Sequence, residues 1–171
     1  PNASLVKFAW DGSAGINLYF SDDAHAKDQG RFAANTTLRA DFLPQSVFGL
    51  FVLDTFRREI QPRNYSSSVT YDRNFNHAEA GIQVRPGEAL QIAASYAFNI
   101  DVFDEFENGD LMYHEARLLA TWDFFPKTTL LFDANLRVND WKHPLDGYRT
   151  NSMPLRVQAG LKGFITKKFA L

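Results

Sequence analysis

The chain of 171 residues contains no cysteine. Disulfide frameworks and thiolate metal sites both need this residue, so the chain has neither. Exported and cytosolic proteins can both lack disulfides, and this absence therefore leaves the compartment open.

Long hydrophobic runs are also missing. The longest is Val47–Leu53, seven residues, whereas a membrane-spanning helix needs about 20. A helical membrane protein is therefore excluded. The first residues lack a basic segment followed by an apolar one, and we expect that any signal peptide has been removed or omitted.

Basic residues do not outnumber acidic ones, and the formal net charge is −2. With no basic stripe to neutralise phosphates, we expect no nucleic-acid partner. Hydrophobic residues make up 45% of the chain and charged residues 22%, which is ordinary for a folded protein. We expect a single domain over residues 1–171.

Short turns recur at almost equal intervals along the chain. They lie at 43–46, 85–88, 125–128 and 165–168, and three of them contain proline, which cannot continue a strand ladder. Longer polar stretches alternate with these turns, at 22–31, 57–67, 104–112 and 140–152. This alternation is typical of an antiparallel up-and-down β-barrel whose two rims face different compartments.

The segments between turns have the period of two that is typical of strands. In residues 89–103, seven apolar side chains occupy seven consecutive alternate positions from Leu90 to Val102. Nine strands are predicted, with a tenth beginning at 169–171: 4–10, 15–21, 33–42, 47–56, 76–85, 89–103, 113–124, 129–139 and 154–164. The segment 47–56 is apolar on both faces apart from Asp54, and its orientation stays open.

The composition of the polar face favours a membrane barrel over a soluble one. A soluble barrel turns a face rich in Lys and Glu toward water, but here the polar positions hold mainly Asn, Gln, Thr, Asp and Arg. The opposite face is rich in Leu, Ala, Val and Phe, which suits lipid, and aromatic residues gather near both strand ends, as in aromatic girdles. The fold class predicted is all-β, an antiparallel up-and-down transmembrane β-barrel.

Charged residues of both signs recur on the polar face, and we expect them to line the lumen. Similar numbers of each sign suggest ion pairs that either line a weakly selective pore or hold a narrow lumen closed. The lumen-facing charges predicted are Arg39, Asp41, Glu79, Arg85, Asp101, Glu115, Arg117, Asp123, Asp133, Arg137, Arg156 and Lys162. Six residues are predicted to face lipid near mid-membrane, namely Leu90, Ile92, Leu118, Ala134, Leu136 and Val157.

Two stretches carry a resemblance to known proteins. Ala120–Ala134 contains Trp-Asp-Phe-Phe-Pro-Lys-Thr-Thr, and Pro154–Thr166 contains Leu-Arg-Val-Gln-Ala-Gly-Leu-Lys-Gly. The chain resembles Gram-negative outer-membrane β-barrel proteins, and these stretches resemble uncharacterised barrels of myxobacteria and related deltaproteobacteria. The resemblance implies a bacterial outer-membrane location, with membrane lipids, lipopolysaccharide and envelope proteins as partners. It supplies no catalytic residues.

The last residues depart from that family pattern. Outer-membrane barrels usually end in a strand with a terminal aromatic residue, whereas this sequence stops at Phe169-Ala170-Leu171, just after a turn. We therefore expect the 171 residues to be a portion of a larger barrel. The alternative is a shorter barrel of 8 or 10 strands.

Enzymatic motifs are missing. Nucleotide-binding glycine patterns, nucleophile elbows and zincin helices do not occur, and in the pair His114-Glu115 the two side chains of a strand point to opposite faces. The loop 104–110 with Glu115 partly resembles a calcium loop, but Phe106 occupies a ligand position and strands flank it. A looser divalent-ion site there is the alternative to a solvated acidic loop. We expect no enzyme, no metal and no cofactor.

These observations lead to two functional hypotheses from different classes. The first is an outer-membrane β-barrel that acts as a passive, porin-like channel or as a structural anchor of an envelope complex. The second is a soluble, lipocalin-like β-barrel that binds an apolar ligand. In the first, the short turns face the periplasm and the long loops face outward.

Overall fold

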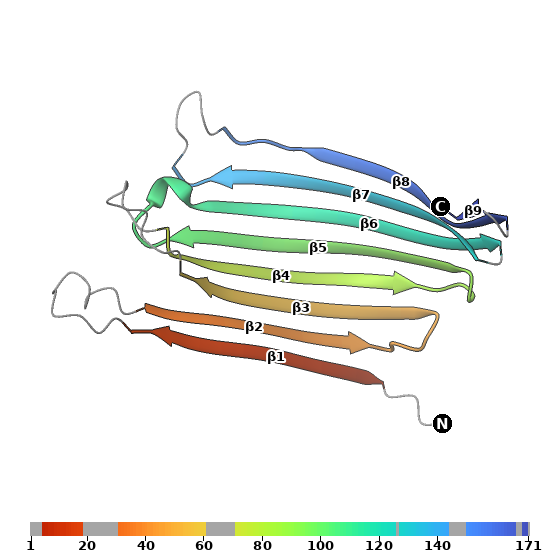
Figure 1. Cartoon of the computed structure of the whole chain (residues 1–171), viewed down its shortest axis with the longest axis horizontal. Coiled ribbons are helices and arrows are strands. Elements are labelled where there is room, and N and C mark those ends of the chain that lie inside the picture. Colours follow the sequence, from red (N-terminus) through yellow and green to blue (C-terminus); the bar gives the residue numbers. More distant parts are fainter. Residues whose placement is uncertain are drawn as a thin grey trace.

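A computed structural model describes residues 5–18, 31–60, 71–125, 127–143, 150–166 and 169–170. They form one antiparallel sheet in which every strand pairs with its neighbour in sequence, in the order β1 to β9 (Figure 1). The all-β, up-and-down order predicted from the turns is confirmed. β1 and β8 lie far apart within this sheet, which is open (Figure 1).

Eight strands are long and the last has two residues. A single 3₁₀ turn, η1, spans Glu107–Gly109. The strands are β1 Val6–Asn17, β2 Arg31–Phe42, β3 Phe48–Glu59, β4 Arg73–Val84, β5 Leu90–Phe103, β6 Leu111–Phe125, β7 Thr128–Trp141, β8 Leu155–Thr166 and β9 Phe169–Ala170. Among the described residues, no helix is long and apolar enough to cross a bilayer.

The predicted separation of strands 4–10 and 15–21 is wrong. β1 runs without a break from Val6 to Asn17, and Gly12 at its centre pairs with Thr36 of β2. The neighbouring strand offers a continuous row of backbone partners, so a central glycine weakens the strand without ending it. This merger leaves eight long strands where nine were predicted.

The short turns lie where the sequence predicts them, as far as they are described. The link from β2 to β3 places Leu43 at a φ of 52° and closes with a hydrogen bond of 3.0 Å from Ser46 N to Leu43 O. Between β6 and β7, Lys127 has a φ of 69°. Residues 126, 167 and 168, and the centres of three of the predicted long loops, lie outside the described residues.

The pairing register divides the side chains of the sheet between two faces. A row perpendicular to the strands runs through apolar side chains only: Val6, Phe42, Leu50, Ile82, Ala94, Leu118, Ala134 and Val157. Because successive residues alternate between faces, this row defines an apolar face and its neighbours a polar face. The register also settles the orientation of 47–56: Leu50 and Val52 share the apolar face, and Phe51 and Leu53 the polar one.

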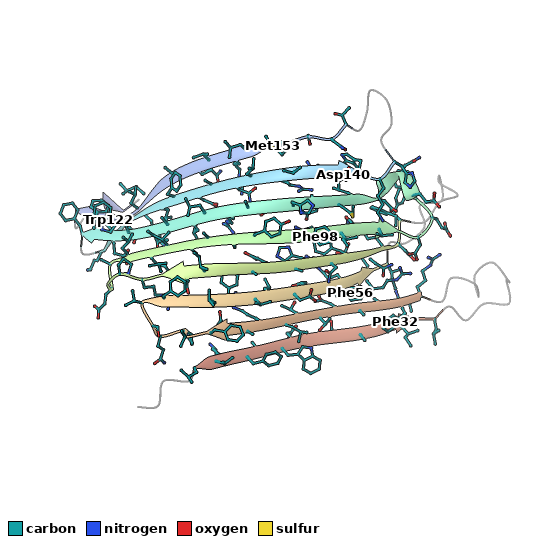
Figure 2. The ribbon with its side chains drawn as sticks, turned by 180° about the vertical axis from the view of Figure 1, so that it is seen from behind. Phe32, Phe56, Phe98, Trp122, Asp140 and Met153 are labelled. Carbon is teal, nitrogen blue, oxygen red and sulfur yellow. The ribbon has the colours of Figure 1, made fainter. Side chains whose placement is uncertain are left out.

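Nothing among the described residues covers the apolar face. Leu118 and Val157, both in this row, keep 41% and 56% of their surface exposed, and many other large apolar residues are exposed with them. Phe32, Phe56, Phe98 and Trp122, which are labelled in Figure 2, belong to the same face by register. The described protein is therefore a single layer with one extended hydrophobic surface.

The strands are progressively staggered. The row described above begins at Val6, the first residue of β1, and reaches β8 at Val157, nine residues before its last residue Thr166. Nine residues at about 3.3 Å each, against seven inter-strand steps of about 4.8 Å, correspond to a tilt of about 40°. If the line that joins the short turns is taken as horizontal, the strands are thus tilted by about 40° from the vertical.

Candidate lumen-facing surface

The register places eleven of the twelve predicted charged positions on the polar face. The twelfth, Arg85, follows the last residue of β4 and donates to Pro44 O and to the Gln83 side chain. That this face lines a lumen stays a prediction.

Ion pairs of short range connect many of these charges. Arg39 and Asp41, two residues apart on β2, pair at 2.7 Å, and Arg117 of β6 pairs with Asp133 of β7 at 2.7 Å. On β6, Glu115 accepts a hydrogen bond of 2.6 Å from Asn135. Since each pair is partly exposed, its contribution to stability is small, about 1 kcal/mol or less.

The end of the polar face toward the long loops holds a denser arrangement. Arg73 bridges Glu59 at 2.7 Å and Asp101 at 2.9 Å. Arginine side chains there also lie over aromatic rings: the Arg137 guanidinium carbon is 3.6 Å from the centre of the Tyr113 ring. Such contacts hold the guanidinium groups flat against the sheet.

A chain of hydrogen bonds crosses the middle of the face. His77 Nδ1 lies 2.6 Å from Asn99 Oδ1, and His77 Nε2 lies 3.2 Å from Glu79 Oε2. Asn99 is fully buried. The carboxylate, imidazole and amide form a fixed polar network, and no nucleophilic side chain among the described residues joins it by a hydrogen bond.

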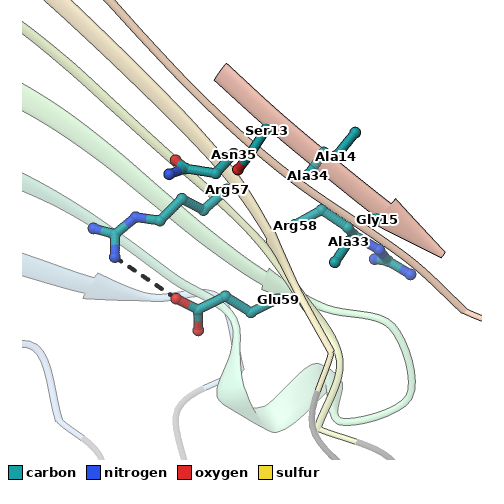
Figure 3. A pocket seen from close by; sticks show the side chains of 9 residues that line it. All are labelled: Ser13, Ala14, Gly15, Ala33, Ala34, Asn35, Arg57, Arg58 and Glu59. Atoms are coloured by element: carbon teal, nitrogen blue, oxygen red, sulfur yellow. Dashed lines mark ion pairs between the residues drawn. The ribbon is translucent and has the colours of Figure 1, made fainter. Parts of the chain in front are cut away.

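A hollow of about 380 Å³ opens where β1, β2 and β3 approach the long loops. On its polar side, Ser13, Asn35, Arg57 and Glu59 gather, with Arg57 and Glu59 3.7 Å apart (Figure 3). Arg58 projects to the other side (Figure 3). The rest of its lining consists of the small residues Ala14, Gly15, Ala33 and Ala34, and the lining as a whole is mainly apolar.

Two further ion pairs link segments at the rim. Arg58 at the end of β3 binds Asp104, after β5, through both carboxylate oxygens, with 2.7 Å from Nη1 to Oδ1. These hydrogen bonds hold the pKa of the Asp104 carboxyl below its usual range. Arg31 pairs with the buried carboxyl of Asp72. Charged pairs therefore join the ends of four strands beside the long loops.

The acidic loop has a structural arrangement of its own. Asp104 pairs with Arg58, and Asp110 accepts a hydrogen bond of 2.9 Å from Phe103 N. Among the described residues, no group of three or more His, Asp or Glu side chains is placed to hold a metal ion. Two of the loop's four carboxylates, those of Asp104 and Asp110, are thus bonded to the protein itself.

The six predicted lipid-facing residues share the apolar face by register. Leu118, Ala134 and Val157 lie side by side on β6, β7 and β8. Leu90 is the first residue of β5, so it lies at the short-turn end of its strand and not at the centre. That the face contacts lipid stays a prediction.

Sequence reasoning missed a group of polar residues on the apolar face. Asp54 pairs in register with Leu38 and Ala78, and Asn76 donates to its Oδ2 at 3.2 Å. Thr36 accepts a hydrogen bond of 3.0 Å from Trp10 Nε1 on the same face. The signal was present, since Asp54 interrupts an apolar run, but a run apolar on both sides does not reveal its face.

Comparison with known proteins adds no relative: no family model, curated protein or solved structure matches this chain. The function is therefore argued from the two faces of the sheet.

Proposed function

We propose that the protein is a bacterial outer-membrane β-barrel protein that acts as a passive, porin-like channel or as a structural anchor of an envelope complex. The observation that carries this proposal is the exposed apolar face of a one-layer sheet. In the proposed state that face contacts lipid, and the polar face lines the lumen.

The hydrophobic effect supports this arrangement. Burying a Leu or Val side chain stabilises a protein by about 1.5–3 kcal/mol, and monomeric soluble proteins rarely expose apolar patches beyond a few hundred Å². The apolar face here extends over all eight long strands. In a lipid bilayer the surroundings of this face are apolar, so leaving the face uncovered by protein does not expose it to water.

The stagger of the strands gives independent support. A tilt of about 40° lies within the range of about 35–45° found in membrane barrels. A 12-residue strand such as β3 then spans about 30 Å along the membrane normal, which is about the thickness of the hydrocarbon core.

The polar face supports both forms of the function. Charges of both signs in pairs, as in Arg39–Asp41 and Arg117–Asp133, suit a weakly selective channel. Cross-strand pairs and the His77–Asn99 hydrogen bond also stiffen the sheet, which suits an anchor. The partners proposed are membrane lipids, lipopolysaccharide and envelope proteins, with the short turns toward the periplasm.

Fractionation tests the proposal. We expect the protein to remain with the membrane after carbonate washing, to need detergent for extraction, and to migrate faster in gels when unheated than when boiled. A protein that stays in solution without detergent and shows no heat-modifiable mobility contradicts the proposal and favours the lipocalin-like alternative. An apolar ligand recovered with such a protein would point directly to that alternative.

A further inference from the structure

The apolar face carries one carboxylate in an unexpected place. Asp54 stands six residues after Phe48, where β3 begins, and five before Glu59, where it ends. If the proposed membrane location holds, Asp54 therefore lies near the middle of the hydrocarbon layer. Ionisable side chains at that depth are costly, and they usually serve a function and pair with another polar group.

Asp54 is one member of a polar patch that we define by Trp10, Thr36, Asp54 and Asn76. These residues come from four consecutive strands, β1 to β4, and lie diagonally next to one another on the apolar face. Two hydrogen bonds join them in pairs: Trp10 Nε1 to Thr36 Oγ1, and Asn76 Nδ2 to Asp54 Oδ2. Within the described residues, Asp54 Oδ1 accepts no hydrogen bond.

Among the described residues, the β5–β8 half of the face carries no carboxylate near the middle of its strands. Val52 of β3 leads in register through Ala80, Tyr96 and Ala116 to Leu136 of β7. On β7 and β8 this central region holds aliphatic side chains, including Leu136 and Val157. The register row of Asp54 continues through Ala78 and Phe98 to His114 of β6, whose Nδ1 is hydrogen-bonded to the Tyr96 hydroxyl. The polar groups on β5 and β6 are thus bonded to each other, whereas the β1–β4 half carries a carboxylate with one oxygen left without a hydrogen bond from the described residues.

We propose that the β1–β4 half of the apolar face is the contact surface for a second copy of this chain within the membrane. The patch is self-complementary, because it offers an acceptor in Asp54 Oδ1 and a donor in the second N–H of the Asn76 amide, whose first N–H donates to Asp54 Oδ2. A two-fold contact brings the same patch of each copy together, so each carboxylate meets the amide donor of the other. Lipid tails offer the Asp54 carboxylate no hydrogen-bond donor.

The main test measures self-association of the full chain in liposomes, by energy transfer between labelled copies. The proposal rests on the membrane function proposed above. The variant Asp54→Leu should raise the dissociation constant of the dimer at least about tenfold. Asp54→Asn keeps an acceptor and should weaken association less. If Asp54 instead faces lipid, Asp54→Leu leaves association unchanged and raises the stability of the monomer, which overturns the proposal.

A second measurement does not depend on changing Asp54. The chain has no cysteine, so the single variants Val52→Cys and Leu136→Cys form a matched pair on one register row. Oxidation should cross-link copies through residue 52 and much less through residue 136. Equal cross-linking at both positions, or none, overturns the proposal. A monomer that still needs detergent and stays heat-modifiable refutes only this contact and leaves the proposed function standing.

Discussion

Replacing Ala134 by Arg should lower the free energy of unfolding by about 2–4 kcal/mol, the cost of a cationic side chain on the lipid face near the bilayer midplane. Ala134 lies midway along β7 and has Leu118 and Val157 as its neighbours on the two adjacent strands. Reversible urea unfolding from liposomes measures this change. It is the largest effect of a single substitution that we expect.

A matched control lies on the neighbouring strand β8, on the opposite face of the sheet. Gln158 pairs in register with Asp133, so Gln158→Arg places the same side chain beside a carboxylate on the polar face. We expect this variant to change stability by less than about 1 kcal/mol. If both variants lose the same free energy of unfolding, arginine is tolerated no better on the polar face than on the apolar face. The assignment of the two faces would then be wrong.

Neutralising three arginines of the polar face should shift ion preference toward cations if the barrel conducts. In the variant Arg117→Gln, Arg137→Gln, Arg156→Gln, the Asp133 carboxylate loses its partner at 2.7 Å and the positive field of three side chains disappears. We expect a severalfold change in the cation-to-anion permeability ratio, read from the reversal potential in planar bilayers under a salt gradient.

The opposite substitutions provide the control. Glu79→Gln, Glu115→Gln and Asp133→Asn together remove negative charge from the same face and should move the reversal potential the other way. Identical shifts in both triple variants would mean that these charges do not line the conduction path. If the wild-type protein does not conduct, the channel form of the proposal fails and the anchor form remains.

Much of the fold was predictable because the relevant signals are local. Prolines and polar residues mark the turns, and alternation over ten or more residues, as in Leu90–Val102, identifies strands and their two faces. The prediction failed where local signals were ambiguous. The sequence pattern places residues 11–14 between two predicted strands, 4–10 and 15–21, but β1 runs through them because they pair with β2, Gly12 with Thr36.

The candidate site was predictable only in part, for a related reason. Alternation assigned the charged residues to one face, but their partners depend on register between strands, which one strand does not specify. The pairing of Arg58 with Asp104 joins residues 46 positions apart, and the position of Asp54 on the apolar face became clear only through its neighbours Leu38 and Ala78.

The most direct test of the account compares two adjacent leucines. Leu118 lies on the apolar face and Leu119 on the polar face of β6, and a chain without cysteine accepts a single spin label at either position. In liposomes, the label at residue 118 should be relaxed by oxygen and protected from a water-soluble nickel chelate, and the label at 119 should be less accessible to oxygen and more accessible to the chelate. Ready relaxation of the label at 118 by the nickel chelate would contradict a lipid-facing apolar surface.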